Sequence, residues 1–163
     1  MSTEERLAEL EARLQRAEDQ LAITNLLNSY GPLVDSGWSD EAPKLWAEGG
    51  GYSYALPGGG SARLAQEEMH KLFESENHIQ LINTGAAHFT AMPKITIQGD
   101  TASAVGYSFV IRREGERWFI WRGAINEWSF FRTSEGWRIK ERENRALDGS
   151  PESHALMRRV AAI

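Results

Sequence analysis

An aspartate and a histidine stand where they could transfer a proton. Asp35 follows the short apolar run Leu33-Val34, so its carboxylate is expected at the edge of a core, and His88 opens a segment in which apolar and polar residues alternate. A carboxylate that accepts the imidazole N–H fixes the tautomer and raises the basicity of the other ring nitrogen. Imidazole titrates near pH ~6.5 in model peptides. The two residues together therefore predict a general base that works at neutral pH.

Tyr30 would complete such a site as a hydrogen-bond donor that polarises a carbonyl or assists a departing hydroxyl. Each of the three residues also has a structural interpretation, which stays open at this point. Asp35 precedes Ser36-Gly37 and could end a helix, His88 could be a hydrogen-bonded structural histidine, and Tyr30 could belong to the core. General acid–base groups contribute roughly 10²–10⁴-fold to a rate, so a surrounding pocket must also orient the substrate.

Other reaction chemistries have little support in the sequence. The chain has no cysteine, which excludes disulfides, thiolate zinc sites and cysteine nucleophiles. The histidines lack the HxH, HxxxH and HExxH spacings of metal sites, and no GxSxG sequence is present. Neither glycine run leads into a phosphate-binding or dinucleotide-binding motif. We therefore expect no metal and no cofactor.

Length and composition indicate one globular domain. The chain has 163 residues, of which 41% are apolar and 25% are charged, and 18 basic against 23 acidic residues give a net charge of −5. The basic residues are interleaved with acids and aromatics, so nucleic acid is not an expected partner. No run approaches the ~20 apolar residues of a membrane span. The absence of cysteine fits a reducing compartment, and a cytoplasmic location is the simplest expectation.

The N-terminal region predicts a long helix over residues 3–30. Apolar residues recur at spacings of three and four, which places them on one stripe of the helix: Leu7, Leu10, Leu14, Ala17 and Leu21. Residues 1–20 are then an arm, which either makes a coiled-coil-like contact in an oligomer or packs on its own domain. Gly31-Pro32 is expected to interrupt the helix.

Short elements are expected next. The pattern predicts a helix at about 40–47 that ends at Gly49-Gly50-Gly51, a strand over 52–56, a loop at 57–60 and a helix over 61–75. His70 and His78 are expected at the surface, or, for His78, at the rim of a pocket.

From residue 85 onward the period of the pattern changes to two. Four alternating segments, separated by turn sequences that contain glycine, predict an antiparallel meander: 87–98, 102–113, 117–132 and 136–145. Helices followed by a sheet are typical of the α+β class, and so long a sheet must curl around the helices and leave a cavity at its open end. The domain is expected to span residues 1–147, followed by a tail over 148–163 with a short helix at 152–162.

Three stretches resemble the SnoaL-like family of the nuclear transport factor superfamily. They are RAEDQLAITNLLNSYGPLVDSGWSDEAPKLW (16–46), AHFTAMPKITIQGDTASAVGYSFVIRR (87–113) and FFRTSEGWRIKERE (130–143), and the resemblance covers roughly residues 15–147. It implies a cone-shaped α+β fold in which a curved antiparallel sheet wraps around the N-terminal helices. One fold hosts many chemistries, so the resemblance says more about structure than about function.

The family resemblance implies candidate functions and a candidate site. Dehydratases, isomerases and polyketide cyclases of this superfamily include members that use an Asp–His pair, sometimes with a Tyr, and the matching positions here are Tyr30, Asp35 and His88. A lyase or isomerase of the dehydratase type that needs no cofactor is the first expectation. The alternative is a non-catalytic ligand-binding or assembly module, similar to the β subunit of ring-hydroxylating dioxygenases.

Further residues are candidates for substrate binding. They are the aromatic residues Trp46, Tyr52, Tyr54, Tyr107 and Trp128, and the charged residues Glu141 and Arg145. Glu141 and Arg145 alternate with Trp137 and Ile139 on the last strand and so are expected at the cavity mouth, although an ion pair is an alternative role for Arg145. The expected substrate is a hydrophobic cyclic molecule, and the aromatic sheet predicts a homodimer or homotrimer.

Overall fold

The computed structural model describes residues 1–56 and 60–162. Its helices are α1 (Thr3–Asp35), α2 (Met69–Phe73), α3 (Glu76–Thr84) and α4 (Pro151–Arg158), with 3₁₀ turns η1 (Ala42–Leu45), η2 (Gln66–Glu68) and η3 (Arg159–Ala161). Its strands are β1 (Trp46–Ala55), β2 (Ser61–Ala65), β3 (Ala86–Thr90), β4 (Lys94–Gln98), β5 (Thr101–Glu114), β6 (Arg117–Thr133) and β7 (Gly136–Ala146).

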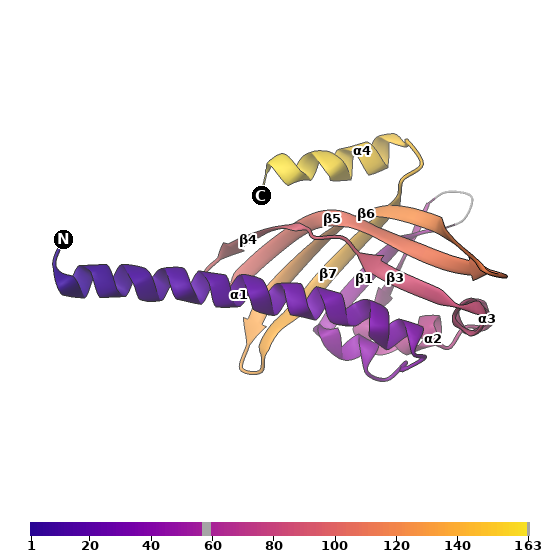
Figure 1. Ribbon diagram of the computed structural model, residues 1–163, viewed down its shortest axis with the longest axis horizontal. Helices are drawn as coiled ribbons and strands as arrows, with labels where there is room; N and C mark the ends of the chain where they lie inside the picture. Colours follow the sequence, from indigo (N-terminus) through magenta and orange to yellow (C-terminus); the bar gives the residue numbers. More distant parts are fainter. Residues whose placement is uncertain (57–59, 163) are drawn as a thin grey trace.

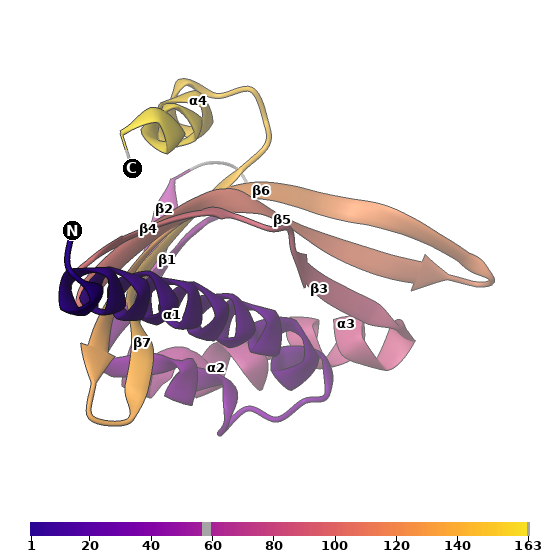
Figure 2. The same cartoon turned by 60° about the vertical axis from the view of Figure 1, so that its left-hand side comes forward.

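The described strands form one seven-stranded curved sheet. Its order is β2-β1-β7-β6-β5-β3, and β4 also pairs with β5. All pairs are antiparallel except β1 with β7, which run parallel. Helices α1, α2 and α3 lie on the concave side of the sheet and α4 lies on the other side (Figures 1 and 2). The predicted α+β class, with a curved sheet around the N-terminal helices, is therefore confirmed.

Helix α1 runs without a break past the position where Gly31-Pro32 was expected to end it. Pro32 lies inside the helix, which continues to Asp35. The proline removes one amide donor, but Tyr30 and Val34 on either side of it are buried in the core, and their packing holds the helical path. The expectation of an interrupted helix was wrong because tertiary burial outweighs the local cost of the proline.

Two predicted helices were wrong for a related reason. Residues 42–45 form only the 3₁₀ turn η1, and β1 begins at Trp46, so that Gly49-Gly50-Gly51 lies within a strand. A Cβ at Gly50 would lie 2.8 Å from the Lys140 carbonyl oxygen, so the glycines let β1 approach β7 closely. The first part of 61–75 is strand β2 and only Met69–Phe73 is α-helical. The predicted loop at 57–60 lies outside the described residues except for its last position.

The predicted meander has its turns where they were expected, but one of its predicted strands is divided into two. Pro93 separates β3 from β4 within the expected strand 87–98, since proline cannot donate to a ladder of hydrogen bonds. This proline packs on Gly106 of β5, where a Cβ would lie 2.7 Å from the proline Cβ. The division allows β3 and β4 to pair with different parts of β5, and β3 also contacts α1.

The two ends of the chain differ in how they pack. Residues 1–18 of the described chain are exposed, including Leu7, Leu10 and Leu14 of the apolar stripe. The predicted C-terminal helix is confirmed, and Leu156 of α4 is buried against Val105 and Ile125 on the outer face of the sheet. None of the helices in the described ranges combines the length and the hydropathy needed to span a membrane.

Candidate functional site

A cavity of about 570 Å³ lies between the concave face of the sheet and the helices. Its walls come from the last turns of α1, from α2 and α3, and from β1, β3, β5, β6 and β7. About half of the lining residues are aromatic or aliphatic, and the others are polar and include two histidines and three arginines. A cavity of this size and character is typical of a site for a small organic ligand.

His88 lines this cavity, and Asp35 lies behind it in contact with its imidazole. Asp35 Oδ1 lies 2.5 Å from His88 Nδ1, and Asp35 Oδ2 accepts a hydrogen bond of 2.6 Å from the His88 backbone amide. Both side chains are largely buried, with exposed fractions of 17% and 18%. The contact favours the tautomer in which Nδ1 carries the proton and donates it to the carboxylate. Nε2 is then the ring nitrogen with a free lone pair. The predicted proximity of the two residues is present in the structure.

The position of Asp35 costs electrostatic stability. Asp35 is the last residue of α1, where the helix dipole disfavours an acid, and the last turn carries no basic residue. The two hydrogen bonds from His88 compensate the carboxylate instead. A carboxylate placed against the dipole and held by a histidine fits a residue that is positioned for chemistry.

Gly31 brings α1 close enough to β3 for this contact. It lies one turn before Asp35 on the same face of the helix, and a Cβ there would lie 2.0 Å from the His88 carbonyl oxygen. Any side chain at this position would push the helix away from the strand. The absence of a side chain at Gly31 therefore permits the short distance between the Asp35 carboxylate and the His88 imidazole.

Tyr30 and His78 surround the imidazole. The ring centroid of Tyr30 is 6.1 Å from that of His88, in an edge-on arrangement, and the ring of His78 is 5.7 Å away. Burial raises the pKa of Tyr30 to about 12, although the nearby Arg142 guanidinium acts in the opposite direction. The phenol therefore stays protonated at neutral pH and can donate a hydrogen bond. His78 Nε2 lies 2.9 Å from the Val34 carbonyl oxygen, which fastens α3 to the end of α1.

The remaining predicted substrate-binding residues fall into three groups. Tyr52 and Tyr54 line the cavity. Trp46 and Trp128 do not line the cavity but are buried in the core beside it, which corrects their predicted role, and Trp46 donates its indole N–H to the Gly51 carbonyl. Tyr107, Glu141 and Arg145 lie outside the lining, which corrects their predicted placement.

The corrections have simple geometric causes. Tyr107 has the same alternation as Val105, which packs on α4, so it points to the outer face and is 45% exposed. On the last strand, β7 contains an extra residue at Lys140, because Phe130 pairs with Ile139 and Ser129 pairs with Glu141.

The irregularity reverses the alternation of β7 beyond residue 140. Glu141 then forms an ion pair with Arg63, and Arg145 forms one with Glu143. Arg142 and Asn144 occupy the inner face in their place.

Arg142 is a residue of the site that sequence reasoning missed. It is 5% exposed, and its guanidinium carbon lies 4.7 Å from the Tyr30 ring centroid and 4.6 Å from that of Tyr52. Its Nε donates to Asn126 Oδ1. Residues 140–145 are all polar, so no apolar residue in the sequence indicated which of them face inward.

Histidine 78 was expected at the surface or at a pocket rim, and the structure places it in the cavity wall on α3. His70 does not belong to the lining. In the part of the chain that the structure describes, no three histidine, aspartate or glutamate side chains gather as a metal site requires.

Comparisons with known proteins agree with this architecture. A solved NTF2-like protein with a cystatin-like fold from Novosphingobium aromaticivorans is 38% identical, with a TM-score of 0.83, and the match covers 93% of this chain and 96% of that one. A protein of unknown function from Mycobacterium tuberculosis is 16% identical over 91% of this chain and 89% of its own, with a TM-score of 0.69.

A more distant structural match is the β subunit of a proposed aromatic-ring-hydroxylating dioxygenase from N. aromaticivorans. It is 18% identical, has a TM-score of 0.62, and is matched over 82% of this chain and 90% of its own. The comparison with curated proteins gave no match. The SnoaL-like domain family matches residues 15–143, most of the chain and the whole of the candidate site except Asn144. The chain therefore belongs to the SnoaL-like domain family.

Proposed function

We propose that the protein is an enzyme that catalyses a dehydration or an isomerisation of a hydrophobic cyclic molecule by general acid–base chemistry, without a cofactor. The proposal rests on one observation above all. Asp35 Oδ1 lies 2.5 Å from His88 Nδ1 at the wall of a cavity of about 570 Å³. A histidine whose one nitrogen is held by a carboxylate, and whose ring borders a ligand-sized cavity, is a suitable general base.

The mechanism uses three side chains. His88 Nε2 removes a proton from a carbon next to a carbonyl, Asp35 stabilises the imidazolium that forms, and the Tyr30 phenol donates a hydrogen bond to the developing enolate oxygen. In an isomerisation the imidazolium returns the proton to a different carbon. In a dehydration it protonates the departing hydroxyl, and water leaves. Both routes balance with the protein's own groups.

Aromatic walls support the choice of a cyclic substrate. Tyr52, Tyr54, Phe73 and Trp121 line the cavity together with Tyr30. Aromatic rings provide large apolar contact areas and favour stacked or edge-on contacts with other rings. A fused-ring ketone is therefore the first compound class to test.

Proton abstraction can be tested without knowing the natural substrate. Exchange of the α-protons of 1-tetralone and related fused-ring ketones with D₂O, followed by ¹H NMR, should be faster with the wild-type protein than without it. His88→Ala should lower the enzymatic exchange rate by roughly 10²–10⁴-fold. His70→Ala, outside the cavity, serves as the matched control and should keep the rate. Equal rates in the wild type and His88→Ala would exclude His88 as the base.

The alternative proposal is a non-catalytic module that uses the same fold. The likeness to a dioxygenase β subunit and the exposed aromatic residues Tyr107, Trp118 and Phe119 favour an assembly role. This alternative predicts no exchange with any of the ketones and a stable complex with a larger subunit. We also propose a homodimer or homotrimer, which sedimentation of the purified protein would test by its mass.

A further inference from the structure

The charged side chains that line the cavity are mainly positive. Three arginines (Arg112, Arg122 and Arg142) line it, and no aspartate or glutamate does so within residues 1–56 and 60–162. The nearby carboxylate of Asp35 lies behind His88 and is bound to it. The positive charge of the lining contrasts with the net charge of −5 for the whole chain. A buried or half-buried positive charge is costly unless an anion compensates it. The lining therefore has an excess of positive charge that a ligand could neutralise.

Neutral amides orient two of these arginines. Arg142 Nε donates to Asn126 Oδ1 at 3.0 Å, and Arg122 Nη2 donates to Asn144 Oδ1 at 3.0 Å. Asn144 Nδ2 donates in turn to Asn126 Oδ1 at 2.8 Å, so that the four side chains form one hydrogen-bonded chain. Asn126 is itself anchored by a bond from its Nδ2 to Ser108 Oγ. Amides fix the direction of a guanidinium but leave its charge uncompensated.

The third arginine has an unsatisfied donor. Arg112 Nε is buried without a hydrogen-bond partner among the described residues, and the guanidinium carbon lies 5.1 Å from the Trp121 ring centroid. Both residues line the cavity. A buried donor left unpaired costs free energy, and a ligand acceptor would remove that cost.

We propose that the ligand of this cavity is an aromatic or polycyclic anion, whose oxyanion group, a carboxylate or a phosphate, binds to Arg122 and Arg142 while another acceptor atom of the ligand pairs with Arg112 Nε. Guanidinium groups bind both kinds of oxyanion with two parallel hydrogen bonds. Tyr30 contacts both the Arg142 guanidinium and the His88 ring, so an anion bound there lies close to the base. This inference rests on the proposed function and specifies its class of substrate.

Calorimetric titration with three matched probes tests the proposal: 2-naphthoate, 2-naphthyl phosphate and the neutral 2-naphthamide. At least one of the two anions should bind ~10-fold more tightly than the amide, as expected for hydrogen bonds to a charged group. Tighter binding of the carboxylate or of the phosphate would identify which oxyanion the site takes. Equal affinity for all three probes would overturn the inference.

Variants locate the binding to these arginines. Arg122→Gln should weaken binding of the preferred anion by ~10-fold and leave the amide almost unchanged, because only the charge-assisted bonds are lost. Arg145→Gln removes the same charge from a residue outside the cavity and should have no effect on either. If Arg122→Gln and Arg142→Gln both bind the anion as the wild type does, the inference is wrong.

One further variant separates this inference from the proposed function. His88→Ala should lose proton exchange and still prefer the anion over the amide. If preference for the anion persists while His88→Ala exchanges protons at the wild-type rate, the catalytic proposal fails and the anion site stands. If His88→Ala loses exchange and no probe shows a preference for charge, the anion site fails and the catalytic proposal stands.

Discussion

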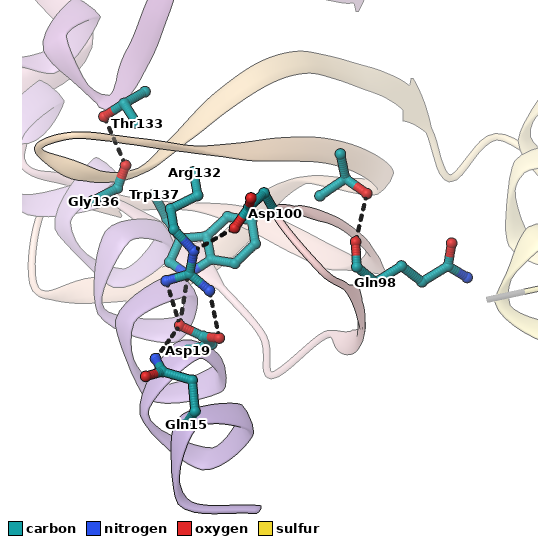
Figure 3. Close-up of polar contacts among 9 residues, drawn as sticks. Gln15, Asp19, Gln98, Asp100, Arg132, Thr133, Gly136 and Trp137 are labelled. Carbon is teal, nitrogen blue, oxygen red and sulfur yellow. Dashed lines mark hydrogen bonds and ion pairs between the residues drawn. The ribbon is translucent and has the colours of Figure 1, made fainter. Parts of the chain in front are cut away.

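Helix α1 carries two carboxylates that bind the sheet, and their partners differ. Asp19 accepts two hydrogen bonds from the Arg132 guanidinium, at 2.7 and 2.6 Å, and others from Trp137 Nε1 and Gln15 (Figure 3). Among the described residues, the hydrogen bonds of Asp35 come from His88, through its ring and its backbone amide. The first contact joins the acid to a permanent cation, and the second joins it to a group that can gain and lose a proton.

The partner decides what each carboxylate can do. Asp19 is 5% exposed, and its hydrogen bonds from Arg132 lower its pKa to about 2 although burial opposes the shift. It stays an anion at all physiological pH values and serves to fix α1 to the β6 and β7 hairpin. Asp35 borders a cavity through His88, so it can influence a reaction. Asp19 and Asp35 have the same residue type and lie on the same helix. Residue type and helix therefore do not show which of the two acids is functional.

The strongest test of this comparison replaces each carboxylate in turn by the neutral amide of asparagine. Asp35→Asn should lower the proton-exchange rate by at least ~10²-fold, since the histidine loses the group that orients its ring and stabilises its cation. Asp19→Asn should keep the rate of the folded protein near the wild-type value. The rates are measured with the fused-ring ketone that the wild type exchanges fastest. Loss of exchange in Asp19→Asn, or its retention in Asp35→Asn, would remove the distinction.

A second test moves the helix at one end only. Gly31→Ala should destabilise the protein by about 3 kcal/mol, because its Cβ would lie 2.0 Å from the His88 carbonyl oxygen and the backbone must shift. An alanine in a helix otherwise gains up to ~1 kcal/mol over glycine, so the sign of the change is informative. Ser29→Ala on the exposed side of the helix is the control. Urea unfolding gives the free energies, and a gain in stability with Gly31→Ala would contradict the close approach.

A third test compares how much each of the two carboxylates contributes to the stability of the fold. Asp19→Asn should cost about 2 kcal/mol of unfolding free energy, because charge-assisted hydrogen bonds to Arg132 become neutral ones. Asp35→Asn should cost about 1 kcal/mol or less, since it loses hydrogen bonds to a partner without a permanent charge. Chemical denaturation of both variants provides the comparison. Equal losses would show that the two contacts stabilise the fold alike.

Sequence patterns predicted the contact at Asp35 better than the contact at Asp19. The family resemblance identified Asp35, His88 and Tyr30, and local alternation suggested that the first two would meet. The contact of Asp19 was not predicted, because its partner Arg132 is remote in sequence and periodicity indicates faces of an element, not pairs between elements.

The same limit explains the errors around the cavity. Because of the extra residue at Lys140 in β7, Arg142 and Asn144 lie on the inner face where Glu141 and Arg145 were expected. No apolar residue beyond Lys140 indicated this change of alternation. The helix predicted over 61–75 failed at its start, because Ser61–Ala65 pairs with β1, and such long-range pairing overrides local helix propensity. The meander of β5, β6 and β7 was predictable because its turns contain glycine between alternating segments.

The smallest expected effect concerns pH. The pKa of Asp19 is lowered in the folded protein to about 2 from an ordinary value of 3.8, so the folded state binds this proton less readily than the unfolded state does. The contribution to stability is complete above pH 3.8 and is lost as the pH falls from there toward 2. Because Arg132 is 30% exposed, solvent screens the interaction, and about 1 kcal/mol is expected. The slope of the unfolding free energy between pH 4 and pH 2 should therefore be smaller in Asp19→Asn than in the wild type. An unchanged slope would mean that Asp19 has no special pairing in solution, and the contrast with Asp35 would lose its electrostatic basis.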